Sequence, residues 1–514
     1  MTTGTDAGSP EATPHEILLA GASVSAPGRE PIVRRSTAAR FAVALRDMSG
    51  AGWVVTGAIV LYIWYTAALT IRNHQGWGTF GFDYGIYDQA LWLMSRFKAP
   101  FVTIMGRNLF GDHTSFILLP FVPLYWIWPD GRLLLFAQSV ALGSTALPLY
   151  RIARRVLGEP WQAATLAVAF LVHPAIAWTN TEQFHPDVFA LPLLAFAFLA
   201  MLDGRWRTFV VCCTGVTMVK EDMLFVIVPL GLYCAWRHDR RRGFLVAAWS
   251  FLWSLFCVYV VLRLLNGKGS LNWWRIPYGS PGAFVRHTIR DPGSVANYLR
   301  TEGRPWYLWQ IMFPVLGISV VAPAVAALAL LPLLSNVVST FWFQHQIQYH
   351  YTAILIPPLY IAAMYGLLRL RGRRLRWVGV VAVGLSSLWS GYLWGPMPVS
   401  RHPTIFAQSS APYVADNRAI AKLIPPNAVV SAYYGYVPHI EHRTEIYQFP
   451  VPFRALYWGV RDEEGKPLTK LIPKVDYVMV PTELGDEQAT MDAIKGDYVL
   501  AARSGDTLLY RRRT

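Results

Sequence analysis

Uncharged apolar stretches, each long enough to cross a lipid bilayer, recur along the chain and limit what it can fold into. A helix rises about 1.5 Å per residue, so crossing a hydrocarbon core of roughly 30 Å takes about 20 apolar residues. Hydrophobic residues make up 54% of the 514 residues, and charged residues only 15%. The sequence therefore predicts a polytopic, mainly α-helical membrane protein. The clearest apolar stretches are 51–71, 133–150, 161–179, 243–262, 352–368 and 377–395.

The net charge of +15 comes mainly from short basic runs beside the apolar stretches. Lys and Arg concentrate on the cytoplasmic side of membrane proteins, where they meet anionic lipid headgroups. No RNA- or DNA-binding signature accompanies these runs, so we expect membrane lipids and no nucleic acid as partners. All four cysteines lie within apolar segments and are expected to be buried apolar side chains. The main basic runs are Arg151–Arg155, Arg237–Arg242 and Arg369–Arg376.

The positions of the basic runs predict a topology. Residues 1–46 are rich in Ser, Pro, Ala and Arg without an early apolar core, so we expect a disordered cytoplasmic tail and no cleavable signal peptide. A transmembrane domain over 47–396 then makes about eleven crossings, with outer loops over 72–131 and 265–310. Segment 113–129 is short and rich in proline, and is expected to be re-entrant or to lie on the membrane surface.

Two further segments are expected to be helical hairpins. As one helix, segment 207–236 would bury the Lys220–Asp222 triplet near the bilayer centre and place its basic flanks on opposite faces. Both arrangements are unfavourable. A hairpin of two short helices with the triplet at its outer tip avoids them. Segment 311–343, broken at Pro323, is expected to form the second hairpin.

Residues 397–514 are more polar and predict a small α/β domain outside the membrane. Strand-like runs alternate there with one helical stretch. The domain contains no Gly-rich phosphate loop and no Cys/His cluster with metal-ligand spacing. With the N-terminus inside, it would lie on the extracytoplasmic side of the plasma membrane. The runs are 429–436, 476–481 and 498–510, and the helical stretch is 413–423.

The ionisable residues outside the basic runs are predicted to gather on the outer face. Convergence of segments distant in sequence is what a catalytic or binding cleft requires. His345 and His350 could equally be polar residues of the membrane interface. The candidate site residues are Asp83, Asp88, Arg107, Asp112, His113, His185, Asp187, Lys220, Glu221, Asp222, His345 and His350.

Several of these residues have a structural alternative. Asp83 could cap a helix over 84–97. Asp88 lies five residues further on, roughly 140° around that helix, and is not expected to share a site with Asp83. His185 followed by a proline suits the start of a helix. The Lys220–Asp222 triplet could place a cation at one helix end and anions at the start of the next, which favours both helix dipoles.

The segments FDYGIYDQALW, GDHTSF, LPLYRIARRVLG, TEQFHPD, VKEDMLF and QYHYTAILIPP resemble a bacterial and archaeal family of membrane proteins catalogued as domain of unknown function 2079. The resemblance covers roughly residues 55–480. That family is in turn similar to the GT-C glycosyltransferases, which take sugars from polyprenyl-phosphate or polyprenyl-diphosphate donors. The resemblance implies that Asp83 is the catalytic base in the first outer loop. The adjacent Asp-Glu pair of many relatives is missing here, which leaves the need for a divalent metal ion open.

The implied reaction is transfer of a sugar from a polyprenyl-phosphate donor to an extracytoplasmic acceptor, a cell-envelope glycan, lipid or protein. A carboxylate would take the proton of the attacking hydroxyl, and direct displacement would invert the anomeric centre. The phosphate leaving group needs a cation, for which Lys220, Arg107 and His350 are candidates. A transporter or translocator of a lipid-linked sugar is the alternative, although such proteins place ionisable groups near the midplane and usually carry internal repeats. A non-catalytic membrane scaffold is a third.

Overall fold

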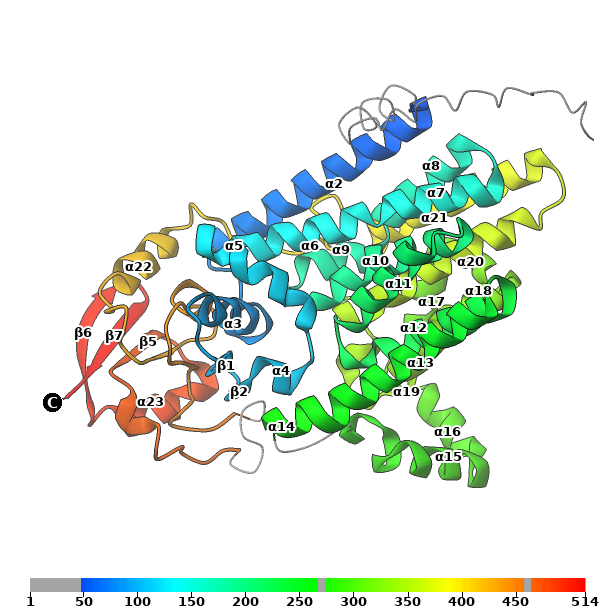
Figure 1. Ribbon diagram of the computed structural model, residues 1–514. Helices are drawn as coiled ribbons and strands as arrows, with labels where there is room; N and C mark the ends of the chain where they lie inside the picture. Colours follow the sequence, from blue (N-terminus) through cyan, green and yellow to red (C-terminus); the bar gives the residue numbers. More distant parts are fainter. Residues whose placement is uncertain (1–47, 267–272, 457–463, 514) are drawn as a thin grey trace, which may run out of the picture. The chain divides into compact units, whose positions relative to one another are not determined.

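The computed structural model of the protein describes residues 48–266, 273–456 and 464–513 (Figure 1). The predicted tail over 1–46 lies outside these residues. Within them, five helices are long and apolar enough to cross a membrane, and one bent pair could make a sixth span. The five are Gly50–Gln75 (α2), Arg132–Ser144 with Ala146–Leu157 (α6, α7), Arg240–Phe256 continuing into Leu262–Asn266 (α13, α14), the turn His350–Leu355 with Ile356–Leu368 (α20), and Arg373–Trp394 (α21). The bent pair is Pro160–Leu171 and Pro174–Thr181 (α8, α9). The helical membrane fold is confirmed.

Glycine and proline set the ends of these helices. Helix α7 ends at Gly158, whose φ of +76° suits a residue without a Cβ, and Pro160 then begins α8. Proline at a first helical position loses no hydrogen bond, because that N–H has no partner within the helix. Pro174 begins α9 in the same way, and the pair α8 and α9 is bent by 44° at the break. Local sequence therefore explains why segment 160–181 is not one straight helix.

The first predicted hairpin is confirmed. Its two helices, Trp206–Thr217 (α11) and Leu224–Arg237 (α12), are separated by a break that carries the Lys220–Asp222 triplet. The guanidinium carbon of Arg242 lies 4.9 Å from the ring centroid of Trp206. The start of α11 therefore lies near the residues that follow α12, as a hairpin requires.

The second predicted hairpin, over 311–343, is confirmed only in part: the chain turns back on itself, but its first helix is Arg304–Met312, and the stretch before Pro323 forms only the short turns Phe313–Val315 and Ile318–Val321. Buried Arg304, at the start of the first arm, donates hydrogen bonds to the carbonyls of Val337 (2.8 Å) and Ser339 (2.9 Å), at the end of the last arm. The helix that follows the break starts at Pro323, as predicted. The segments are Arg304–Met312 (α17), Pro323–Ala326 (α18) and Leu330–Val338 (α19).

Ion pairs join several of the predicted cytoplasmic turns. Arg155 in the last turn of α7 contacts Asp203 after Ala190–Leu202 (α10) at 2.6 Å, and Arg373 contacts Glu159 at 2.8 Å. Basic turns distant in sequence therefore lie together, as the topology requires. Apart from the long helices, the apolar helices are short, and Phe116–Ile127 is one of them. The number of crossings, about eleven, stays a prediction. So does the side of the membrane on which each loop lies.

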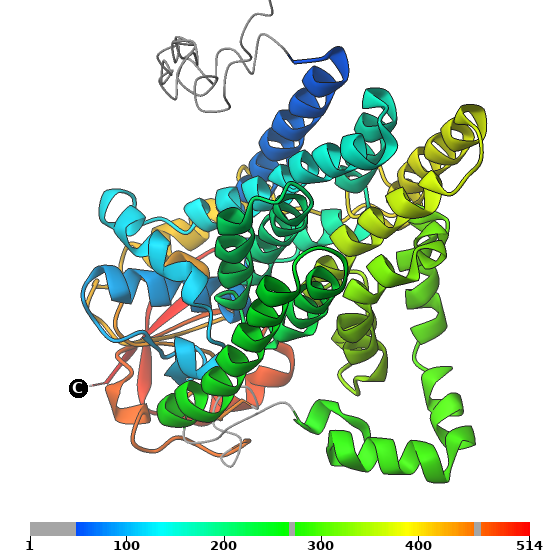
Figure 2. The ribbon, with the colours of Figure 1, turned by 45° about the vertical axis from the view of Figure 1, so that its right-hand side comes forward.

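The outer segment between α2 and α6 carries Ile86–Ser95 (α3), Leu109–Asp112 (α4), Val122–Ile127 (α5) and the antiparallel strands Phe101–Val102 (β1) and Arg107–Asn108 (β2). After α21, a five-stranded sheet forms in the order β4-β3-β5-β7-β6. Strand β3 pairs in parallel with β4 and β5, whereas β7 pairs antiparallel with β5 and β6. Figures 1 and 2 show this sheet beside α3 and Pro412–Ala421 (α22), and away from Pro281–Arg290 (α15) and Pro292–Leu299 (α16). The strands are Val430–Ala432 (β3), Ile446–Gln448 (β4), Tyr477–Pro481 (β5), Tyr498–Ser504 (β6) and Thr507–Arg512 (β7), with Gln488–Ile494 (α23) before the last two.

The α/β character of the C-terminal region is confirmed, with two differences from the predicted strands. The run 498–510 is two strands, because Gly505 adopts a φ of +51° and turns the chain between β6 and β7. Strand β4 was not predicted, since a three-residue strand buried along its whole length shows no alternation of apolar and polar residues.

The C-terminal region shares a hydrophobic core with the outer segment. Trp77, Leu91 and Ile104 from the outer segment belong to the same buried cluster as Val430 and Ile446 from the sheet. Removing the C-terminal region would expose this apolar surface to water. Point substitutions therefore test its role better than deletion does. The division into a transmembrane domain and an outer domain stays a prediction.

Candidate active site

A loop between α9 and the turn Pro186–Phe189 is fixed by one buried glutamine. Gln138 on α6 donates to the carbonyls of Thr179 (3.1 Å) and Gln183 (2.8 Å), and its own carbonyl accepts from the backbone N–H of His185 at 3.0 Å. A buried amide that satisfies several backbone groups holds the loop in one conformation. The side chains of Glu182 and His185 are thereby held in place.

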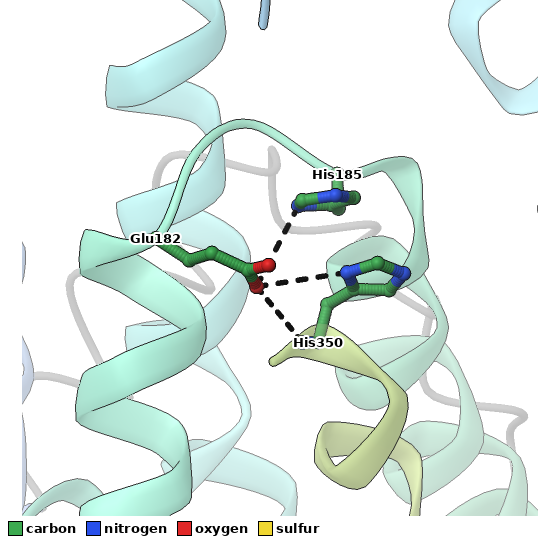
Figure 3. A group of neighbouring side chains, drawn as sticks. All are labelled: Glu182, His185 and His350. Atoms are coloured by element: carbon green, nitrogen blue, oxygen red, sulfur yellow. Dashed lines mark hydrogen bonds and ion pairs between the residues drawn. The ribbon is translucent and has the colours of Figure 1, made fainter. Parts of the chain in front are cut away.

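Glu182, His185 and His350 form a compact cluster (Figure 3). Oε2 of Glu182 accepts from the backbone N–H of His350 at 2.9 Å and lies 3.6 Å from Nδ1 of His350 and 4.0 Å from Nδ1 of His185. The imidazole rings are stacked, with centroids 3.6 Å apart. Both ring nitrogens of His185 and Nδ1 of His350 are buried without a hydrogen-bond partner in the described chain. Two imidazoles and one carboxylate are a ligand set that suits a divalent metal such as Zn²⁺, so the cluster fits the metal ion left open by the sequence.

The protonation of this cluster follows from its surroundings. Burial raises the pKa of Glu182 to about 8, and the nearby Asp83 raises it as well, although His185 opposes the shift. Burial opposes the charged form of His185, but the carboxyl groups of Glu182 and Asp83 outweigh it and raise the pKa of this imidazole to about 9. Without a bound metal, the imidazole of His185 is therefore mainly protonated at neutral pH, and a metal bound to this ring would displace that proton.

Asp83 lies beside this cluster in a strained turn. The helical turn Gly81–Gly85 places Asp83 at φ +64° and ψ −83°, a conformation that costs a non-glycine residue about 1–3 kcal/mol. Oδ1 of Asp83 lies 3.6 Å from Nε2 of His185, and the Asp83 side chain is 37% exposed. Helix α3 begins at Ile86 without a side-chain cap. Asp83 therefore does not cap this helix, which was the structural alternative; its partly exposed carboxyl group lies against the buried imidazole of His185.

A cleft of about 700 Å³ opens beside the cluster, between α12, α14, α15 and α19. Lys220, only 6% exposed, lies at its polar end, with Nζ 3.7 Å from Oδ1 of Asp187 and 5.6 Å from the ring centroid of Tyr351. Burial opposes the charged form of Lys220, but the carboxylates of Asp187 and Asp222 keep its pKa above the ordinary value. A smaller cavity shares Asp222 and Tyr351 with the cleft and is also lined by Asp187 and His350. The cleft thus lies next to the Glu182 cluster.

Two ion pairs line the neighbouring wall. Nδ1 of His113 lies 2.8 Å from Oε1 of Glu221, whose other oxygen accepts from the backbone N–H of Thr114 at 3.1 Å. Burial opposes the charged form of Glu221, yet His113 and Lys220 bring the pKa of this carboxyl below its usual range. Arg107 contacts Asp112 at 2.9 Å. Four of the candidate residues are thus paired with each other, His113 with Glu221 and Arg107 with Asp112. These pairs fix the loops around the cleft.

Most of the predicted site residues meet around the cleft, and two do not. Asp88 lies in a separate cluster with His442, in agreement with the expected separation from Asp83. His345 lies 3.5 Å from Glu302 and outside both cavities just described. The brought-together candidates are Asp83, Arg107, Asp112, His113, His185, Asp187, Lys220, Glu221, Asp222 and His350.

Sequence reasoning missed Glu182 and Arg275. Glu182 lies in the segment TEQFHPD. An acidic residue beside an apolar helix is the one feature of the sequence that could have identified it as a site residue. Arg275 follows two tryptophans in the outer loop, and its guanidinium carbon lies 4.2 Å from the ring centroid of Phe341. Its Nε is buried without a hydrogen-bond partner in the described residues, and the side chain lines the cleft. A cation held by aromatic rings in this way is suited to an anionic ligand.

Residues 77–502 match the family described as "Predicted membrane protein (DUF2079)". The chain belongs to this family. The fold of this DUF2079 member is similar to that of ArnT from Cupriavidus metallidurans, a GT-C glycosyltransferase. The crystal structure of ArnT bound to undecaprenyl phosphate gives a TM-score of 0.58 at 14% identity, over 90% of this chain and 98% of ArnT. The apo structure of ArnT gives 0.56 at 14% identity, with the same coverage. A search of curated proteins gives no match. The fold is GT-C-like.

Proposed function

We propose that the protein is a glycosyltransferase that moves a sugar from a polyprenyl-phosphate donor to an acceptor at the outer surface of the plasma membrane. The observation that carries the proposal is the cleft next to the Glu182 cluster, which Asp83 contacts through His185. Its polar end presents Lys220 and Arg275, and its remaining wall is largely apolar. A lipid-linked sugar phosphate has the same division, with an anionic headgroup and a long hydrocarbon chain. The apolar wall includes Leu224, Phe225, Val258, Leu262, Leu331 and Leu334.

The chemistry assigned to the site is a single displacement. The acceptor hydroxyl oxygen attacks the anomeric carbon while the bond from that carbon to the phosphate oxygen breaks. The proton of the hydroxyl passes to the Asp83 carboxylate, and polyprenyl phosphate leaves with the bonding electrons. The anomeric configuration is inverted. Lys220 and Arg275 stabilise the charge that grows on the phosphate.

The neighbouring groups support these roles. Nε2 of His185 lies 3.6 Å from Oδ1 of Asp83, and this contact helps to orient the carboxyl group of the proposed base. Glu182, His185 and His350 are the residues that would hold a divalent metal, which when bound supplies positive charge beside the leaving phosphate. Asp187 keeps Lys220 charged. The acceptor, a cell-envelope glycan, lipid or protein, would reach Asp83 from its exposed side.

Native mass spectrometry of the protein in mild detergent tests the donor class. With synthetic polyprenyl phosphate added, we expect a bound species whose mass increase equals one lipid. The matched polyprenol, which lacks the phosphate, should not be retained, because charge-assisted hydrogen bonds from Lys220 and Arg275 need an anion. Equal retention of both lipids would mean that the cleft binds hydrocarbon chains without recognising the headgroup, and would remove the main support for the proposal.

A further inference from the structure

A second cluster of ionisable side chains lies apart from the cleft, where the outer segment meets the C-terminal region. Asp88 comes from α3, and Glu441 and His442 follow the turn Val437–His439. Nε2 of His442 lies 3.1 Å from Oδ1 of Asp88, and one ligand atom from each of the three residues lies within 4.8 Å of the others. Asp88 and Glu441 are each only 2% exposed. Residues separated by about 350 positions thus converge on one point.

The cluster contains an unsatisfied group. Oε2 of Glu441 is buried and has no hydrogen-bond partner among the described residues. Two carboxylates buried side by side are costly unless a positive charge compensates them. His442 can supply at most one such charge, and it already contacts Asp88. The unpaired oxygen therefore points to a further cationic occupant, either a metal ion or a proton shared by the two carboxyl groups.

The donor set and its supports favour a metal ion. One imidazole and two carboxylates are ligands that Zn²⁺ accepts at about 2.0–2.2 Å, which in tetrahedral geometry places neighbouring ligand atoms roughly 3.3 Å apart. The hydroxyl of Tyr125 donates to Asp88 at 2.7 Å, and the ring of His442 stacks on Trp92 with an interplanar angle of 14°. Outer contacts of this kind orient ligands in metal sites.

The cluster is also open to a ligand from solution. It borders a cleft of about 660 Å³ whose lining includes the polar side chains of His74, Asp130 and Arg132. A metal held by three protein ligands in such a position keeps at least one coordination site for water or another ligand. We propose that Asp88, Glu441 and His442 bind a divalent cation of the zinc class, which joins the outer segment to the C-terminal region. This site is independent of the proposed transferase chemistry.

Zinc binding by the purified full-length protein tests the site. After chelation and dialysis, the parent protein is titrated with Zn²⁺, and bound metal is counted by elemental analysis. Glu441→Gln keeps the size of the side chain but weakens its ligand oxygen, so it should bind one equivalent less than the parent. Glu445→Gln is the matched control, because this carboxylate pairs with Lys474 at 3.2 Å outside the cluster, and it should bind as the parent does.

Thermal unfolding provides a second measurement on the same proteins. Excess Zn²⁺ should raise the Tm of the chelated parent, because a ligand that binds only the folded state stabilises it. Glu441→Gln should lose the part of the Tm shift that comes from the Asp88 cluster. Glu182→Gln, which alters the other cluster, should retain that part. If Glu441→Gln does not fold, His442→Asn replaces it, since the His442 side chain is 32% exposed. Parent-like stoichiometry and parent-like Tm shift in the folded variant would overturn the proposal and assign a shared proton to the two carboxyl groups.

Discussion

Replacing Asp83 by asparagine is expected to lower the rate of sugar transfer by about 10²–10⁴-fold. The amide keeps the size and hydrogen-bonding capacity of the side chain but cannot take the proton of the acceptor. Asp83 is partly exposed and contacts the imidazole of His185 at 3.6 Å without capping α3. Its replacement should therefore leave the Tm and the binding of polyprenyl phosphate nearly unchanged. The measurement is the transfer rate of purified protein in proteoliposomes, with lipid binding measured in parallel.

One control variant shows whether the effect is specific to Asp83. Asp486→Asn, on an exposed turn of the C-terminal region, should have the parent rate. Asp88→Asn suits this purpose less well, because the Asp88 side chain is buried against Tyr125 and His442 and its change would disturb that cluster. If Asp83→Asn transfers sugar at the parent rate, Asp83 is not the base. Asp112, Asp187, Glu221 and Asp222 would then be the remaining acidic candidates around the cleft.

Replacing Lys220 by methionine is expected to weaken the binding of polyprenyl phosphate by about 10–100-fold. A hydrogen bond to a charged group contributes about 1.5–3 kcal/mol, and each 1.4 kcal/mol corresponds to a factor of ten in Kd. Methionine retains much of the side-chain volume, so packing against Tyr351 should persist. Lys220→Arg should keep part of the affinity, because it restores the positive charge. The Kd is measured with a labelled polyprenyl phosphate.

The loss of the cation also leaves Asp187 without its partner at 3.7 Å. A fall in stability could therefore be mistaken for a fall in affinity. The double variant Lys220→Met with Asp187→Asn removes the unpaired carboxylate and should recover stability while the Kd stays weak. Lys495→Met, at an exposed position, should leave the Kd unaltered. An unchanged Kd in folded Lys220→Met would show that Lys220 does not bind the phosphate.

The sequence was informative about features that one local rule decides. Span length follows from bilayer thickness, so the apolar stretches predicted the long helices. Charges at the bilayer centre are costly, so the Lys220–Asp222 triplet predicted the break between α11 and α12. Candidate residues next to helix ends, such as Asp83 and His185, could be expected to converge. Most of the candidates gather around one cleft because the predicted topology places these helix ends on one face of the membrane.

What the sequence could not predict depends on contacts between distant segments. Asp88 pairs with His442, 354 positions away, and no local pattern indicates that partner. No local pattern indicates that Arg275 could bind an anion, because its contact with Phe341 forms only in the folded chain. The shared core of the outer segment and the sheet is a third case. Neither part has a local sequence pattern that indicates that its apolar residues pack against the other part.

The most direct test of the proposed transferase is the fate of the glycosyl bond in a reconstituted system. Purified protein in proteoliposomes is supplied with a polyprenyl-phosphate sugar labelled in both the lipid and the sugar, together with an envelope extract as acceptor. The proposal predicts release of free polyprenyl phosphate and movement of the sugar label to the acceptor, both strongly reduced in Asp83→Asn. A translocator would instead move the intact donor across the bilayer. Transbilayer movement of the uncleaved donor, with no free polyprenyl phosphate, would contradict the proposed function.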